Sequence, residues 1–339
     1  MQNIFHFSTY FSKTIAFYQK FAIIKRIKIT EVLFMEYSAK KQVSFSMLLM
    51  ITSIVWGFAF VAQVKASEAN MGSFLFNGLR YILGTIMLVP VMLFFERNKL
   101  SKKIFKRTFI QGSISGLVMM AAVNFQQYGI NANMNAGKSG FITALYIVLI
   151  PITGLFFKQK TNLLTWVAVA ISLFGLFLIS IPKGAAMLNT AELVGDLLVL
   201  ISAFFWTAQI LCVDRFSKES CPVLFSVMQF AVCGVSSFLI AIFVDDFSPS
   251  ILSASLMPVL YGGLISVAIG YTIQVIAQRH ASPTVASIAM ASESVFAAIG
   301  GYLILDEIMT NRQLIGALLV FGSILLSQFA TTLHSKKEA

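Results

Sequence analysis

The chain has 339 residues, 58% of them hydrophobic and 12% charged, with 25 Lys and Arg against 14 Asp and Glu, a formal net charge of +11. A soluble domain carries about 25% charged residues and cannot cover this much apolar side chain with its own surface. The composition therefore indicates a membrane protein, and it excludes a disordered chain, a disulfide scaffold and a soluble enzyme.

Ten apolar stretches, each long enough to cross a bilayer as a helix, follow one another along the chain and are separated by short polar turns. They run from Val43 to Val64, Ser73 to Phe95, Phe109 to Gly129, Ser139 to Phe157, Leu163 to Ile181, Leu193 to Val213, Val223 to Val244, Leu256 to Ala277, Thr284 to Leu305 and Gln313 to Thr332. The stretches lack the alternating pattern of an outer-membrane barrel, so we expect an all-α polytopic membrane protein. Pro151 in the fourth segment and Pro258 near the start of the eighth predict a kink in one of these helices.

The two ends of the chain fall outside the ten segments. Residues 1–42 form an N-terminal extension for which two interpretations remain open. Residues 12–29 form a basic interfacial helix, or the start is mis-assigned and translation begins at Met35. Residues 333–339 form a short tail, which we expect in the cytoplasm.

The distribution of Lys and Arg predicts the orientation. With ten spans and a cytoplasmic N-terminus, only Lys65, Lys138, Lys183 and Arg312 fall outside, Arg80 lies within a helix, and the other twenty of the 25 fall inside. Cytoplasmic loops carry an excess of Lys and Arg, so we expect a multi-pass protein of the cytoplasmic membrane with both termini inside. The basic charge is then a topology signal, which argues against nucleic acid as a partner and leaves the lipid bilayer as one.

A shift of about 150 positions brings the two halves of the chain into register. The shift pairs Trp56 with Trp206, Arg80 with Gln229 and Asn124 with Gln274. Because five helices per half is an odd number, the second half crosses the membrane in the opposite sense. We therefore predict two inverted five-helix repeats, over residues 43–181 and 193–332. This architecture is typical of secondary transporters, whose substrate site lies near the membrane midplane between the halves.

Three stretches resemble EamA-type permeases of the drug/metabolite transporter superfamily. They are AGKSGFITALYIVLIPITGLFFKQK from Ala136, GDLLVLISAFFW from Gly195 and YTIQVIAQRHASPTVASIAMASESVFAA from Tyr271. The similarity extends over about residues 44–332, and so over both halves. The resemblance implies ten helices in two EamA repeats, cytoplasmic termini, and carriage of metabolites, amino acids or drugs, often outward.

Glu293 is the most informative single residue. It lies nine residues into the ninth segment, about 14 Å deep at 1.5 Å per residue. An acidic group at the bilayer centre costs at least about 2.5 kcal/mol, so it must face protein or water. Its stripe neighbours Ala286, Ala289, Ala297 and Gly300 are all small, so another helix or a cavity comes close. Two interpretations stay open: a carboxylate that carries a proton or binds a substrate amine, or a structural Glu hydrogen-bonded to a neighbouring helix.

Arg80 is the second charge inside the membrane. Its stripe neighbours Ser73, Asn77 and Gly84 are polar or small, so the side chain points into the bundle. We consider two roles for it: pairing with Glu293, or binding a substrate carboxylate with its planar fork of donors.

Uncharged polar and aromatic side chains provide the remaining candidates. The polar ones lie on one face each of the third and eighth segments, at repeat-related positions. The candidates are Asn124, Gln127, Tyr128, Gln274 and Gln278, with Trp56, Trp206 and Tyr146 as aromatic lining. Amides around a cavity suit a polar zwitterionic or amide-bearing solute. Hydrogen bonding between helices, and packing for the aromatic residues, is the competing interpretation.

Neither a metal site nor a cofactor is expected. The three His are not clustered at ligand spacing, the three Cys form no CxxC motif, and the sequence has no Walker-type phosphate loop. Transport driven by ATP on this chain is therefore excluded.

These observations predict a secondary transporter that moves a small metabolite across the cytoplasmic membrane by alternating access, in the export direction. Proton coupling is one option, and the monomer and the homodimer both remain open. The alternatives are a membrane-embedded enzyme acting on a lipid-linked substrate, or a channel. Short loops poor in His, Asp and Glu argue against the enzyme, and the lack of charged rings argues against the channel.

Overall fold

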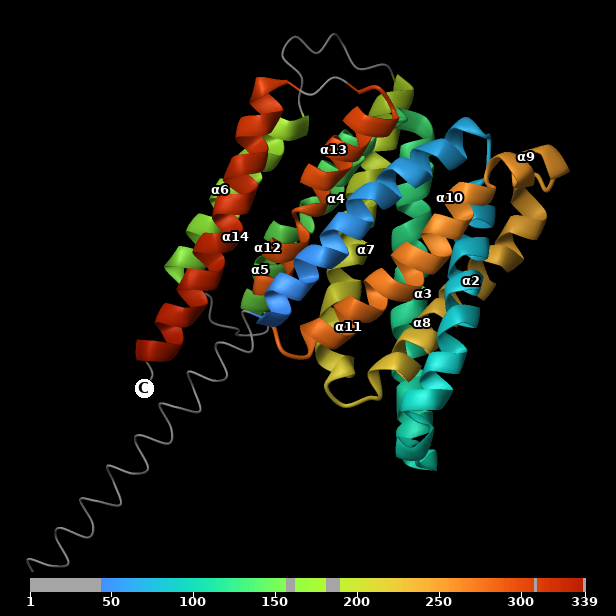
Figure 1. Ribbon diagram of the computed structural model, residues 1–339, viewed down its shortest axis with the longest axis horizontal. Coiled ribbons are helices and arrows are strands. Elements are labelled where there is room, and N and C mark those ends of the chain that lie inside the picture. Colours follow the sequence, from blue (N-terminus) through green and yellow to red (C-terminus); the bar gives the residue numbers. More distant parts are fainter. Residues whose placement is uncertain (1–43, 157–161, 181–189, 308–309, 338–339) are drawn as a thin grey trace, which may run out of the picture.

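The computed structural model describes residues 44–156, 162–180, 190–307 and 310–337, and every element in these ranges is helical (Figure 1). In chain order the elements are a first helix Ser44–Glu68, α2 Ser73–Phe95, η1 Arg97–Lys99, α3 Lys102–Asn133, α4 Ala136–Ala144, α5 Tyr146–Phe156, α6 Leu163–Ser180, α7 Thr190–Ser217, α8 Pro222–Val244, α9 Pro249–Ala254, α10 Leu256–Leu260, η2 Tyr261–Tyr271, α11 Thr272–Gln278, α12 Pro283–Met290, α13 Glu293–Ile304 and α14 Asn311–Lys337. The predicted N-terminal extension, residues 1–42, lies outside the described residues.

Among the described residues, eight helical segments are long and apolar enough to cross a membrane. They correspond to the first four predicted segments and to the sixth through the ninth. The fifth and tenth predicted segments hold shorter apolar helices, Leu163–Leu178 within α6 and Leu314–Ser327 within α14.

The bundle is apolar outside, and its interior holds polar side chains together with a hydrophobic core. The side chains of Phe94, Phe156 and Phe243 are more than 80% exposed, whereas Asn77 and Gln209 are fully buried. A surface of this kind needs lipid around it, and the buried polar side chains are then shielded from the hydrocarbon. The chain is thus a multi-pass membrane protein.

Two of the predicted spans are interrupted near their centres. The fourth is divided at Leu145 into α4 and α5, and Pro151 lies within α5 rather than at the break. The ninth is divided just before Glu293 into α12 and α13, whereas the apolar run over residues 284–305 predicts one continuous helix. There the hydroxyls of Ser292 and Ser294 each donate to a carbonyl three residues earlier, at 2.8 Å. Such bonds compete with the helical ladder and favour a break.

The eighth span combines three helical forms. Pro258 lies in α10, which continues into the π-helix η2 and then into α11. Glycines let this span approach its neighbours: a Cβ atom on Gly263 would stand 2.9 Å from the Arg80 carbonyl, and one on Gly270 would stand 2.8 Å from the Trp56 ring nitrogen. The π-helix is thereby packed closely against α2 and the first helix.

Helices α2 and α8 cap each other with carboxylates. Glu96, directly after α2, accepts hydrogen bonds from the backbone N–H groups of Val223 (3.0 Å) and Leu224 (2.8 Å) at the start of α8. Asp245, directly after α8, accepts from the N–H of Leu75 (2.6 Å) at the start of α2. A carboxylate at a helix N-terminus satisfies unpaired N–H groups and favours the helix dipole. The two helices are therefore fastened to each other at both ends.

A third carboxylate of this kind is Glu307, in the turn after α13. It accepts a hydrogen bond from the N–H of Ala136 (3.3 Å) at the start of α4. Burial raises the pKa of the Glu307 carboxyl, and hydrogen bonds from the backbone of Ala136 and Gly137 oppose that rise. Burial likewise raises the pKa of Asp245, against the opposing hydrogen bonds from the backbone of α2.

The remaining helices pack in pairs. Helix α3 lies against α7 and α8, α4 against α13, α5 against α12, and α6 against α14. The pair α6 and α14 stands at one side of the bundle, and the first helix, drawn in blue, runs diagonally across the middle of the bundle (Figure 1). Ser53 on that first helix donates to the carbonyls of Ala289 (3.2 Å) and Met290 (3.1 Å), next to the break in the ninth span.

Candidate functional site

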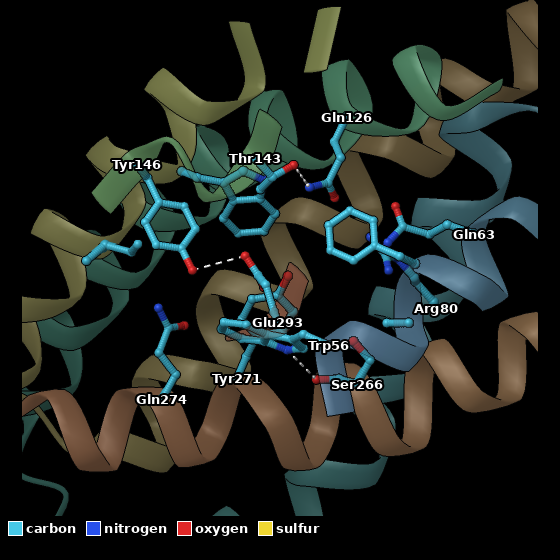
Figure 2. A pocket seen from close by; sticks show the side chains of 14 residues that line it. Trp56, Gln63, Arg80, Gln126, Thr143, Tyr146, Ser266, Tyr271, Gln274 and Glu293 are labelled. Atoms are coloured by element: carbon cyan, nitrogen blue, oxygen red, sulfur yellow. Dashed lines mark hydrogen bonds between the residues drawn. The ribbon is translucent and has the colours of Figure 1, made fainter. Parts of the chain in front are cut away.

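A polar cavity lies at the centre of the bundle, among both interrupted helices and the π-helix (Figure 2). It encloses about 410 Å³, a figure that includes space open to solvent. Its lining consists of Trp56, Ala59, Phe60, Gln63, Arg80, Gln126, Thr143, Tyr146, Trp206, Ile210, Ser266, Tyr271, Gln274 and Glu293. Helices from before residue 181 and from after residue 189 both contribute, so the cavity is shared by the two halves of the chain.

The two helix breaks meet at this cavity. Glu293 is the first residue of α13 and Tyr146 is the first residue of α5. The Tyr146 hydroxyl donates to Glu293 Oε1 at 3.0 Å, and both side chains are buried (Figure 2). The carboxylate lies in the first turn of α13, where the helix dipole favours negative charge. The breaks therefore bring an acid and a phenol together in the interior.

Arg80 lines the same cavity from α2. Its side chain is 2% exposed, and its guanidinium carbon lies 5.0 Å from the centroid of the Phe76 ring and 5.1 Å from that of Tyr81. Its Nε donates to Asn77 Oδ1 at 2.9 Å. Within the described part of the chain, no carboxylate lies within 4.0 Å of Arg80, Glu293 included. Arg80 and Glu293 thus share a cavity without forming the ion pair that we considered for them.

Three aromatic rings form one wall. The Tyr271 ring contacts both tryptophans, with its centroid 4.5 Å from that of Trp56 and 5.8 Å from that of Trp206, and it is nearly parallel to the Trp206 ring at 9°. Trp56 donates from its ring nitrogen to the Ser266 carbonyl at 3.4 Å. Two of the rings come from predicted candidates and the third comes from η2. Such a wall offers apolar faces to a bound solute.

Several buried polar atoms at the cavity have no hydrogen-bond partner among the described residues. They are the side-chain oxygens of Gln63 and Gln274 and the ring nitrogen of Trp206. The amide nitrogen of Gln274 is used, since it donates to Gln209 at 3.3 Å, and Gln126 donates to Thr143 at 2.9 Å. A buried polar atom without a partner costs about 1–3 kcal/mol. A ligand or water in the cavity would remove that cost.

Six of the ten predicted site residues therefore lie at the cavity, and four do not. The six are Glu293, Arg80, Gln274, Trp56, Trp206 and Tyr146. Asn124 is buried between α2, α3 and α8, where it donates to Ser237 at 2.9 Å. Gln127 bonds to the first helix and to Asn131, and Gln278 reaches the Ile210 carbonyl at 3.5 Å. Tyr128 is 40% exposed, with its ring edge against Phe74.

Eight lining residues were not among the sequence candidates. They are Ala59, Phe60, Gln63, Gln126, Thr143, Ile210, Ser266 and Tyr271. A helical stripe predicts part of this set: Ala59, Phe60 and Gln63 stand three, four and seven positions after Trp56, and so on the same face. Tyr271 likewise stands three positions before Gln274. No comparable signal in the sequence distinguishes Gln126 from the neighbouring Gln127.

The fold and the cavity together define a class of protein. A polytopic helical bundle that surrounds a buried polar chamber, lined from both halves of its chain, is built to hold a small solute inside a membrane.

The chain belongs to the EamA-like transporter family, whose sequence model matches residues 44–181 and 193–329. It is therefore a transporter of the drug/metabolite type rather than an enzyme, with a small molecule as its substrate and lipid as its surroundings.

Named relatives agree with this family. An uncharacterized transporter of Archaeoglobus fulgidus is 24% identical over 279 residues, covering 82% of this chain and 83% of its own length. The uncharacterized transporter YoaV of Bacillus subtilis is 26% identical over 287 residues, covering 82% and 94%. A WAT1-related protein of Arabidopsis thaliana is 21% identical over 306 residues, covering 80% of each. One solved crystal structure shares the fold with a TM-score of 0.66 and 15% identity, covering 85% of this chain and 98% of that one.

Proposed function

We propose that the protein is a secondary carrier that exports a small metabolite, an amino acid or a drug-like solute across the cytoplasmic membrane by alternating access. The central cavity is its substrate site. The observation that carries the proposal is the pair of buried, mutually unpaired charges, Arg80 and Glu293, at a cavity lined from both halves. Charges at this depth are costly and are kept where a solute or ion is bound.

The halves of this carrier are two inverted five-helix repeats, residues 43–181 and 193–332, with α6 and α14 as the fifth and tenth spans. The caps of α2 and α8 support this arrangement. Glu96 follows α2 and caps α8, Asp245 follows α8 and caps α2, and the two residues stand 149 positions apart. The interrupted helices support it too, because Tyr146 and Glu293 stand 147 positions apart and each follows a break. Inverted repeats with discontinuous helices at the midplane are the usual construction of secondary transporters.

The orientation follows from charge. Loops rich in Lys and Arg lie in the cytoplasm, so both termini lie there, and the start of α4 faces outward. At that outer end Lys138 pairs with Asp196 at 2.6 Å, and Glu307 caps α4, so contacts between the two halves close the cavity on the outside. In alternating access these contacts break when the outer side opens.

Counterflow of a mixed, isotope-labelled metabolite extract tests the carrier function for many candidate solutes at once. Proteoliposomes are loaded with the unlabelled extract and diluted into the labelled one, and mass spectrometry follows the label inside. We expect at least one labelled solute to rise above its equilibrium level and then to fall. A channel gives equilibration without that overshoot. Accumulation no greater than in protein-free liposomes contradicts transport altogether.

Coupling to protons through Glu293 is part of the proposal. Its location beside Tyr146 in the cavity supports this role, because a carboxylate there can hold a proton or a substrate amine in turn. Glu293→Gln keeps the shape and removes the charge. We expect the variant to lose the dependence of transport on an imposed pH gradient, with Glu68→Gln, an exposed carboxylate outside the cavity, as the matched control. Unchanged transport with unchanged pH dependence in Glu293→Gln excludes the residue from the mechanism.

A further inference from the structure

Arg80 is a buried cation that has no countercharge among the described residues. Its two terminal nitrogens form no hydrogen bond with any described residue, and its Nε is bonded to a neutral amide, Asn77. The rings of Phe76 and Tyr81 cover it without neutralising it. A guanidinium that is 2% exposed and has no acid beside it favours an anionic group in the cavity that it lines. A carboxylate matches its planar fork of donors with two parallel bonds.

Glu293 provides the negative charge at the cavity. Only one of its oxygens, Oε1, receives a hydrogen bond from a described residue, the Tyr146 hydroxyl. The other oxygen, Oε2, is left for a donor in the cavity. A cationic amine is the donor that a carboxylate binds most strongly.

The unpartnered neutral atoms at the cavity favour the same kind of molecule. The unpartnered oxygens of Gln63 and Gln274 accept hydrogen bonds, and the unpartnered nitrogen of Trp206 donates one. A solute with both donors and acceptors satisfies all of these atoms, whereas a simple anion leaves the glutamine oxygens and the carboxylate without partners. The rings of Trp56, Tyr271 and Trp206 line the same cavity and offer apolar faces to the rest of the solute.

Resting on the proposed carrier function, we infer that the solute is a zwitterion whose carboxylate docks on Arg80 and whose cationic amine docks on Glu293. Its remaining, apolar part lies against the tryptophan and tyrosine rings. Arg80 and Glu293 do not pair with each other in the cavity that both line, and in this inference the solute bridges them.

The test is ligand-induced stabilisation of the purified full-length protein, measured as the shift in Tm. Three series are used, and each keeps one carbon skeleton in zwitterionic, anionic and cationic form. They are alanine, propionate and ethylamine; leucine, isocaproate and isoamylamine; and phenylalanine, hydrocinnamate and phenethylamine. We expect the zwitterion of at least one series to raise Tm in proportion to its concentration, and the anion and amine of that series to do so only at concentrations about tenfold higher or more.

Variants test whether Arg80 binds the carboxylate of the solute and Glu293 binds its amine. Arg80→Gln suits this purpose because the repeat-related position already holds a buried glutamine, Gln229. Arg80→Gln and Glu293→Gln should each remove the shift given by the zwitterion. Arg107→Gln, which removes an exposed cation paired with Glu219 on the α3 side of the bundle, should keep it.

Each other outcome contradicts the inference. Equal stabilisation by the anion, insensitive to Glu293→Gln, makes the solute a simple anion. Stabilisation by the amine that survives Arg80→Gln makes it a cation, and no shift from any zwitterion in the three series overturns the assignment. The carrier function fails separately: a zwitterion that binds without counterflow removes that function, whereas counterflow of a solute that is not zwitterionic removes only this inference.

Discussion

The cap that Glu96 forms on α8 is a part of the fold whose contribution can be measured. Glu96 is 4% exposed, and both of its oxygens accept backbone hydrogen bonds, from Val223 and Leu224. In Glu96→Gln the negative charge is lost, and the new NH₂ group faces one of the two N–H donors. Loss of one buried hydrogen bond to a charged group costs about 1.5–3 kcal/mol, so we expect the first turn of α8 to be destabilised by about that amount.

Thiol labelling resolved by mass spectrometry provides the assay. Cys221 is the residue before α8 and is 9% exposed, and Cys233 lies fully buried within the same helix. A loss of about 1.5–3 kcal/mol in local stability corresponds to labelling of Cys221 that is about 10- to 150-fold faster, with a smaller change at Cys233. Glu68→Gln, which alters only an exposed pair with Lys65, should change neither rate. Labelling of Cys221 at the wild-type rate in Glu96→Gln would falsify the cap.

Two further predictions concern packing and pH. Gly57→Ala should cost about 1–3 kcal/mol and lower Tm, because the added Cβ would stand 2.3 Å from Phe296 Cβ and 2.8 Å from the Ala297 nitrogen. A Cβ on Gly137 would have no neighbour nearer than 3.7 Å, so the control Gly137→Ala should change the stability by less than about 0.5 kcal/mol. Equal Tm values for the two variants would show that the first helix does not pack this closely on α13. Because burial raises the pKa of Asp245 in the folded state, this residue favours folding most below the ordinary aspartate pKa of about 4, and that contribution is lost as the pH rises through the raised pKa. Asp245→Asn should therefore remove a fall in stability with rising pH, measured as Tm from pH 4 upward, and a variant that keeps the wild-type slope contradicts the assignment.

The sequence predicted the helices well because their main determinant is local. A stretch of about 20 apolar residues has few other stable arrangements in a bilayer, so each predicted segment overlaps a helix in the described residues. The sequence did not predict where the fourth and ninth spans are interrupted, at Leu145 and just before Glu293. At the break before Glu293, serine hydroxyls of the same span and of the first helix donate to backbone carbonyls, and periodicity does not register such bonds.

The sequence predicted which residues line the cavity where charge decides their burial, and it did not where rotation about the helix axis decides which side chain faces inward. Arg80 and Glu293 must face the interior whatever the details of packing, and both line the cavity. Gln126 and Gln127 differ by about 100° around one helix, and only Gln126 faces the cavity. The end of α3 carries polar residues on several faces, so composition alone does not select the face toward the cavity.

Alternating access is the central claim, and a reversible cross-link at the outer end tests it most directly. A Cβ atom on Gly137 in α4 would lie 3.8 Å from Ala298 Cβ in α13, within the range that a disulfide requires. The variant Gly137→Cys with Ala298→Cys is made after the three native cysteines have been replaced, and its counterflow is measured oxidised and reduced, with each single variant as the control. We predict that oxidation abolishes counterflow and that a reductant restores it. If the fully cross-linked protein showed counterflow at the same rate as the reduced protein, α4 and α13 would not need to separate, and alternating access through this end would be wrong.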